Sequence, residues 1–412
     1  MALLLAALVM TCCAALASLL AWSDTRGRLA FGSMLLFGGL SLILVAIGTS
    51  LRESDAVAVM IAATPTPAPP TPAPTVVVTP AAVTSEGTFV VEAASEPGAF
   101  ELPTSFTFGD DGELYVGFEA GIRKVRDLDG DGFYEDVGHF GYDAGWVFGL
   151  DFHDGSLYAA INGSVMRFKD IDGDGVADEQ ARLLSGLPQQ HYGGHSNSGL
   201  IVTQDGLIYM TVGGTSDHGP EVEPLGGTIL TMPIAGGTAD IYASGFRNPY
   251  DIAFCPDGRL YASDNGPDFI ADGVDETAPD EVNLILPGRN YGYPDYFGPQ
   301  DVSTGTESPI ALLPERAGAT GIICHDGAGL PEGYAGNLFV TMWGTFTSQI
   351  ETGRRVMRVE LSETPDGGVS GVTTELAAGF GHPIDILQDA DGSMLVLDFE
   401  HGQLFRIRYV GG

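Results

Sequence analysis

The chain has 412 residues, of which 44% are apolar and 58 are glycine, so it can bury a large core and contains many turns. Its formal net charge of −36 argues against a protein that binds nucleic acid or anionic membrane surfaces. Such acidity suits a soluble domain with cation-binding loops, although a solvated acidic surface accounts for most single carboxylates.

The N-terminal part, residues 1–52, contains two apolar runs. Residues 2–22 and 29–51 are each about long enough to cross a bilayer as a helix. The short polar loop between them carries Arg26 and Arg28, and the positive-inside rule then favours a cytoplasmic loop with the rest of the chain outside the cell membrane. A signal peptide is the alternative, but the first run lacks a basic n-region. We therefore expect a membrane anchor of two transmembrane helices and an extracytoplasmic domain.

A linker over residues 53–85 follows the predicted anchor. Its residues 62–80 read AATPTPAPPTPAPTVVVTP, a composition rich in proline and threonine. Such a segment is extended and semi-rigid and cannot bury a core. We expect it to act as a spacer.

One hairpin pattern recurs through residues 86–412. Each copy has an apolar strand, a tight turn and a second strand, as in DIAFCPDGRLYASDNG. The copies begin at Ser105, Gly149, Gly199, Asp251 and Asp385, and a fainter copy with an insertion begins at Gly321. Further strand-like runs follow the hairpins, for example residues 121–126 and 354–361. The pattern predicts an all-β, six-bladed β-propeller, with residues 87–94 pairing with the last blade to close the ring.

Two acidic loops have the spacing D-x-D-G-D-G. The first contains Asp127, Asp129 and Asp131, and the second contains Asp170, Asp172 and Asp174. This spacing gathers three carboxylates in a tight loop, and hard cations such as calcium prefer oxygen ligands. Neither loop has glutamate at its twelfth position, so neither is a helix-loop-helix calcium site. Structural calcium and bare acidic turns remain the two interpretations, and we favour calcium.

Two cysteines, Cys255 and Cys324, lie in hairpins of different predicted blades. A disulfide requires a proximity that sequence does not supply. We therefore expect two buried free thiols.

Three polar residues precede predicted inner strands. His195 stands just before the strand that begins near Gly199, and Arg247 and Asn248 stand at the matching place of the next blade. Strand ends of this kind meet around the central channel of a propeller. A histidine, a fixed cation and an amide that converge on one pocket could abstract a proton and stabilise a developing anion. A structural histidine and an Arg-Asn-Pro segment that ties neighbouring blades are the alternatives.

Five sequence motifs, in a fixed order along the chain, are similar to those of a known protein family. They are His195 with Ser198-Gly199-Leu200, SGFRNPYDIAF from Ser244, DNGPD from Asp264, DEVNLILPGRNYGYP from Asp280 and GNLFVTMWGT from Gly336. From about residue 100 to its end, the chain resembles the quinoprotein sugar dehydrogenases of the glucose and sorbosone dehydrogenase type. These are six-bladed propellers that use pyrroloquinoline quinone (PQQ) and calcium.

The resemblance implies a mechanism for these residues. His195 would take the proton of the anomeric hydroxyl of a sugar while hydride passes to the quinone. Arg247 would lie against the quinone oxygens and Asn248 would bond the cofactor. Backbone carbonyls of Gly266 and Pro267 would help to hold calcium. Electrons would then pass to an external acceptor.

The chain also departs from the family pattern. No basic residue occupies the strand at 339–344, and His382 stands in the last blade where relatives carry an arginine against the cofactor carboxylates. Gly214 occupies the place of the acidic partner of the base, with Asp217 as a nearby substitute. Because PQQ carries three carboxylates, the loss of cations should weaken its binding. The alternative function is a non-catalytic propeller with a degenerate cofactor pocket that binds a glycan or a protein.

Overall fold

The computed structural model describes residues 79–84, 87–142, 145–189, 195–216, 219–267, 278–345 and 352–411. All of them belong to the second of two compact units, Ala73–Gly412. Within these ranges no helix is long and apolar enough to cross a membrane. The predicted membrane hairpin of residues 1–52 and most of the predicted linker lie outside the described residues.

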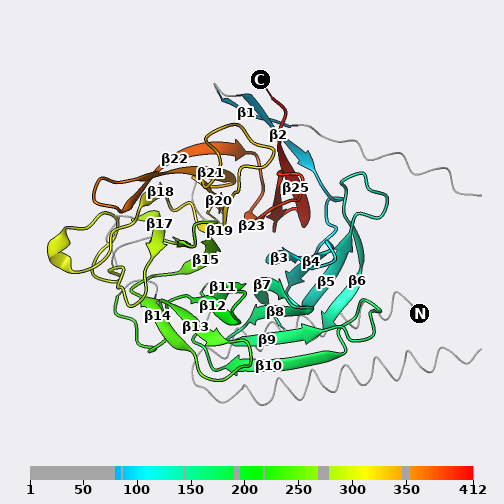
Figure 1. Cartoon of the computed structure of the whole chain (residues 1–412), viewed down its shortest axis with the longest axis horizontal. Helices are drawn as coiled ribbons and strands as arrows, with labels where there is room; N and C mark the ends of the chain where they lie inside the picture. Colours follow the sequence, from blue (N-terminus) through cyan, green and yellow to red (C-terminus); the bar gives the residue numbers. More distant parts are fainter. Residues whose placement is uncertain are drawn as a thin grey trace, which may run out of the picture. The chain divides into compact units, whose positions relative to one another are not determined.

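Six antiparallel sheets form a propeller, as predicted (Figure 1). Blade 1 contains β3 (Ser105–Phe108), β4 (Leu114–Phe118), β5 (Gly121–Arg126) and β6 (Glu135–Tyr142). Blade 2 contains β7 (Val147–His153), β8 (Ser156–Ile161), β9 (Ser164–Lys169) and β10 (Glu179–Ser185). Blade 3 contains β11 (Asn197–Val202), β12 (Leu207–Val212), β13 (Thr228–Pro233) and β14 (Asp240–Ser244).

The last three blades repeat this plan. Blade 4 contains β15 (Pro249–Phe254), β16 (Leu260–Asp264), β17 (Pro279–Ile285) and β18 (Ala311–Glu315). Blade 5 contains β19 (Ala319–Cys324), β20 (Leu338–Met342), β21 (Arg355–Glu363) and β22 (Val369–Ala378). Blade 6 contains β23 (Pro383–Gln388), β24 (Met394–Asp398) and β25 (Gln403–Tyr409). All six predicted hairpins are the first two strands of a blade.

The ring closes through the N-terminal strands of the domain. β2 (Gly87–Ala93) pairs antiparallel with β25 and so supplies the fourth strand of blade 6, which confirms the predicted closing strand. β1 (Thr79–Thr84), inside the stretch predicted to be a linker, pairs with β2 and adds a fifth strand. The blue β2 therefore lies beside the red β25 in Figure 1. An ion pair of 2.6 Å between Glu92 and Arg408 joins these two strands.

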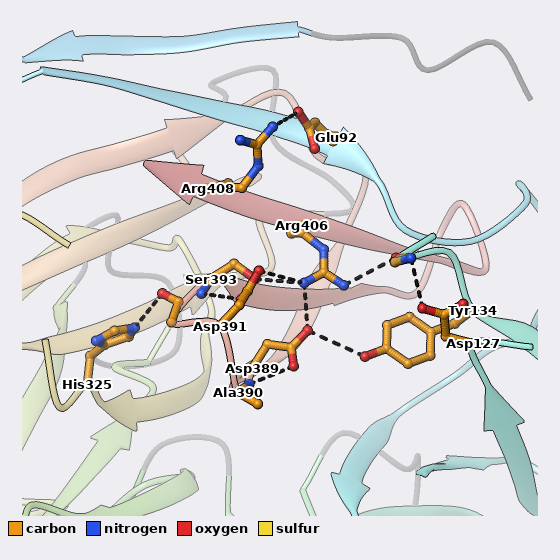
Figure 2. Close-up of polar contacts among 12 residues, drawn as sticks. Glu92, Asp127, Tyr134, His325, Asp389, Ala390, Asp391, Ser393, Arg406 and Arg408 are labelled. Carbon is orange, nitrogen blue, oxygen red and sulfur yellow. Dashed lines mark hydrogen bonds and ion pairs between the residues drawn. The ribbon is translucent and has the colours of Figure 1, made fainter. Parts of the chain in front are cut away.

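Arg406 of β25 connects blade 6 to blade 1 (Figure 2). Its Nη1 donates to Asp389 Oδ2 at 2.6 Å and to Ser393 Oγ at 2.8 Å, both within its own blade. Its Nη2 donates to the Gly132 carbonyl of blade 1 at 3.2 Å. The Tyr134 hydroxyl, also from blade 1, donates to Asp389 Oδ2 at 3.4 Å. One partly buried guanidinium thus connects the first and last blades of the ring.

Inner strands line a central channel. Asp151, Asp251 and Asp385 lie on the inner strands of alternate blades, and each accepts a backbone N–H from the next inner strand, at 2.7, 3.0 and 3.0 Å. A cavity of about 240 Å³ lies among these strands. Burial raises the pKa of Asp151 to about 6 and also raises the pKa of Asp385. The hydrogen bonds of these carboxyls therefore connect neighbouring inner strands around the ring.

The expectation of two free thiols is wrong. Cys255 and Cys324 form a disulfide, with their Cα atoms 5.1 Å apart. Cys255 directly follows β15, and Cys324 ends β19, the inner strand of the next blade. Because neighbouring inner strands run side by side, two residues 69 positions apart in sequence meet at the same end of the ring.

Candidate functional site

The candidate site lies on the face of the ring where the inner strands begin. His195 precedes β11, Arg247 and Asn248 precede β15, and His382 precedes β23. The structure therefore places all four predicted side chains at the start of inner strands on one face. Their exposed fractions are only 4–8%, so each must find polar partners inside the protein.

His195 is oriented by a backbone carbonyl. Its Nδ1 lies 2.8 Å from the carbonyl oxygen of Gly214, in the loop after β12. Since a carbonyl only accepts, Nδ1 carries the proton and the lone pair of the neutral ring is on Nε2. The histidine thus has the tautomer that a general base needs. Asp217, the nearby acidic substitute named above, lies outside the described residues.

Asp264 holds Arg247 and Asn248 in place. It ends β16, and its carboxylate accepts the backbone N–H of Asn248 at 2.8 Å and that of Arg247 at 3.3 Å. The Asn248 amide donates to Asn265 Oδ1 at 2.8 Å, and Asn265 in turn donates to the carbonyl of Ala319 in blade 5. The segment therefore does tie neighbouring blades, as the structural alternative expected.

Blade 6 repeats the hydrogen bonds that Asp264 makes in blade 4. Residues 245–252 and 379–386 share the pattern G-F-x-x-P-x-D-I, with His382 in the place of Asn248. Asp398 ends β24 and accepts the backbone N–H of Gly381 at 2.7 Å and that of His382 at 3.3 Å. A carboxylate at the end of the second strand thus fixes the residues before the first strand in both blades.

A group of buried acids surrounds the loop with Gly266 and Pro267. Asp280 accepts the backbone N–H groups of Gly266 and Ala319 at 2.9 and 2.8 Å, and burial raises its pKa to about 7. Burial and the neighbouring Glu281 raise the pKa of Asp264 well above its ordinary value. A Cβ atom on Gly266 would lie 2.4 Å from the Pro279 carbonyl, so only glycine fits this backbone path.

His382 lies in a small cluster with residues of blades 5 and 6. Its ring stacks on Trp343 at 4.5 Å, its Nδ1 lies 2.9 Å from the Trp343 carbonyl, and its Nε2 lies 3.8 Å from Glu400. Arg354 also approaches Glu400, at 3.7 Å. Arg355 instead pairs with Glu375 of β22. The sequence did not identify Glu400, whose signal is its place directly after the last hairpin.

The two acidic loops lie on the opposite face, where β5 and β9 end. In each loop the three carboxylates offer oxygen atoms within 4.8 Å of one another. The first carboxylate of each loop also accepts backbone N–H groups, and Asp127 accepts those of Gly130, Asp131 and Gly132 at 2.7, 3.2 and 2.8 Å. A cation bound there would therefore be far from His195 and would have a structural role.

A protein of unknown activity and a dehydrogenase are among the sequence relatives. An uncharacterized protein of Borreliella burgdorferi is 26% identical over 243 residues, which cover 54% of this chain and 63% of that protein. Quinoprotein glucose dehydrogenase B of Acinetobacter calcoaceticus is 29% identical over 153 residues, which cover 29% of this chain and 30% of that enzyme. The chain thus spans less than two thirds of the length of either relative.

Solved structures share the fold. The PQQ-bound aldose sugar dehydrogenase of Streptomyces coelicolor superposes with a TM-score of 0.59 at 18% identity, over 80% of this chain and 99% of that one. At this identity the likeness establishes the fold alone. The family model for glucose/sorbosone dehydrogenase matches residues 157–406, which is more than half of the chain. The chain therefore belongs to the glucose/sorbosone dehydrogenase family.

Proposed function

We propose that this protein is a PQQ- and calcium-dependent dehydrogenase that oxidises a sugar or a related polyol and passes electrons to an external acceptor. The observation that carries the proposal is the orientation of His195, whose Nδ1–H is held by a carbonyl beside the buried Arg247 and Asn248. Family membership supports the reaction class. The names of the Acinetobacter and Streptomyces proteins support the quinone cofactor and the sugar substrate.

The groups at this face suit PQQ, which carries a quinone and three carboxylates. Arg247 supplies a buried guanidinium for the quinone oxygens, and Arg354 supplies positive charge for the carboxylates. His382 would bind a carboxylate through Nε2 when its ring is protonated. Arg354 compensates for the missing basic residue of the strand at 339–344. The carbonyl oxygens of Gly266 and Pro267 offer the hard ligands that calcium prefers.

The protein's own residues would then carry out proton removal. PQQ, when bound, supplies an acceptor for the two electrons that leave the sugar carbon. His195 Nε2 would take the proton from the sugar hydroxyl, and the Gly214 carbonyl would stabilise the resulting imidazolium by accepting the Nδ1–H. Arg247 would stabilise negative charge that develops next to it, and Asn248 would orient the cofactor.

A non-catalytic propeller that binds a glycan or a protein is the second candidate. The observation that favours it is Glu400, whose carboxylate lies within 4 Å of both Arg354 and His382. An anion at this place competes with a cofactor carboxylate for these two side chains. A pocket of this kind could therefore have lost PQQ while it retained the scaffold.

We also propose that the propeller lies on the extracytoplasmic side of the cell membrane. Support comes from the Cys255–Cys324 disulfide, because such bonds persist in oxidising compartments and are rare in the cytosol. The two apolar runs of residues 1–52 would anchor it, with the positively charged loop inside. The acidic loops that begin at Asp127 and Asp170 would bind structural calcium.

The test is a titration of the full-length, detergent-solubilised protein with PQQ, with and without calcium, followed by quinone absorbance after aldoses are added. Calcium-dependent binding and bleaching of the quinone by a sugar support the dehydrogenase. His195→Gln should abolish turnover and leave PQQ affinity nearly unchanged. His153→Gln, at the end of β7 on the opposite face, is the matched control and should retain turnover. No binding at high micromolar PQQ would favour the non-catalytic propeller.

A further inference from the structure

We propose that Glu221 is a positioning residue for His195 and acts on it through the peptide group between Gly214 and Thr215. The inference rests on the proposed role of His195 as the general base. Glu221 lies in the loop between β12 and β13, on the same face as the candidate site.

A single peptide group connects the two side chains. Its carbonyl, from Gly214, lies 2.8 Å from His195 Nδ1 and accepts its N–H. Its amide, from Thr215, donates to Glu221 Oε2 at 2.5 Å. The order along this chain of hydrogen bonds is therefore carboxylate, peptide and imidazole. A carboxylate at the N–H end polarises the peptide and strengthens the carbonyl as an acceptor.

The carboxylate of Glu221 is itself fixed. It accepts the Thr215 hydroxyl and the backbone N–H groups of Val222 and Glu223, the latter two at 2.7 and 2.9 Å. A Cβ atom on Gly226 would lie 2.5 Å from Glu221 Cδ, so glycine is needed for the side chain to fold back over its own loop. Although burial opposes it, the hydrogen bonds from Thr215 and the backbone lower the pKa of Glu221, which keeps the group ionised at neutral pH.

The hydrogen bonds from His195 through the peptide to Glu221 stabilise the protonated His195 ring, as an acidic partner bonded directly to the ring would. When His195 accepts a proton at Nε2, the ring becomes a cation, and a polarised carbonyl at Nδ1 stabilises it. The same loop is tied to the cationic side of the site, because the Gly214 N–H donates to the Arg247 carbonyl at 2.7 Å. The Gly214–Thr215 peptide therefore cannot turn away without breaking contacts at both ends.

The experiment compares Glu221→Gln with Glu223→Gln. The control removes the same charge from an exposed side chain two positions away. With 15N-labelled histidine in the full-length protein, the Nδ1–H signal of His195, assigned by its loss in His195→Gln, reports the hydrogen bond without any cofactor. We expect Glu221→Gln to shift this signal to higher field or lose it to exchange, while Glu223→Gln leaves it in place.

Kinetics with PQQ and an aldose provide the second measurement. Glu221→Gln should lower kcat by roughly 10- to 100-fold, by analogy with residues that orient metal ligands, with KM and PQQ affinity unchanged. Glu221→Asp keeps the charge and should restore part of kcat. An Nδ1–H signal in Glu221→Gln identical to that in Glu223→Gln would overturn the inference. If no variant and no parent protein turns over, the proposed function fails, and the resonance still decides whether Glu221 acts on His195.

Discussion

Replacement of both Cys255 and Cys324 by alanine should lower the free energy of unfolding by about 4 kcal/mol. The bond closes a loop with a sequence separation of 69, and the chain-entropy relation gives about 3 kcal/mol for 15 residues and about 4.7 for 100. Both cysteines lie where inner strands end, whereas the candidate site lies where they begin, roughly 20 Å away for a strand of this length. The variant should therefore lose stability and retain binding at the site.

Urea unfolding of the parent and the double variant, followed by tryptophan fluorescence, measures this difference. Peptide mapping by mass spectrometry under non-reducing conditions first establishes that the two cysteines are joined in the parent protein. Equal unfolding free energies in the presence of an intact bond would refute the entropic reasoning. Recovery of both peptides as free thiols would refute the bond itself, and with it the support for an oxidising compartment.

Three further predictions concern stability. Arg406→Met should lower the free energy of unfolding by about 1–3 kcal/mol, because it leaves the partly buried Asp389 carboxylate without its cation. Arg408→Met changes a more exposed pair and should cost less than about 1 kcal/mol. At constant calcium, thermal stability should fall as pH rises from about 4 to about 7. The reason is that the folded state holds protons on Asp151 and Asp280 that the unfolded state has released. A rise in stability over this range would contradict burial as the cause of their raised pKa values. A chelator should lower Tm, and Asp131→Asn should reduce that effect; an unchanged Tm in excess chelator would favour bare acidic turns.

The blade architecture was predictable because each blade repeats one local signal. A hairpin with alternating apolar residues and a tight turn needs only neighbouring residues for its recognition, and six copies in order determine the ring. The closing strand was also predictable, since the last hairpin lacks a fourth strand of its own and residues 87–94 have strand character. The disulfide was not predictable from the hairpin signal, because that signal does not give the distance between residues of different blades. The equivalent positions of Cys255 and Cys324 at the ends of successive inner strands bring them together.

The candidate site was predictable to the extent that its residues occupy repeat positions. His195, Arg247 and Asn248 precede inner strands, and that position alone directs them to one face. Arg354 and Glu400 come from loops of different blades, and their approach depends on how those loops fold over the ring. No sequence pattern encodes that contact. The effect of Glu221 on His195 passes through a backbone peptide, so no pairing of residue types could reveal it.

The propeller separates groups for stability from groups for binding. The face where the inner strands end carries the disulfide and the acidic loops, whereas the face where they begin carries His195, Arg247 and Glu221. Because strands of about 20 Å separate these faces, variants on opposite faces share no contacts and their free-energy effects should add. The unfolding change of the double cysteine variant combined with Glu221→Gln should therefore equal the sum of the two separate unfolding changes, and its kcat change should equal that of Glu221→Gln alone. A coupling larger than about 0.5 kcal/mol between them would mean that the inner strands transmit strain across the ring.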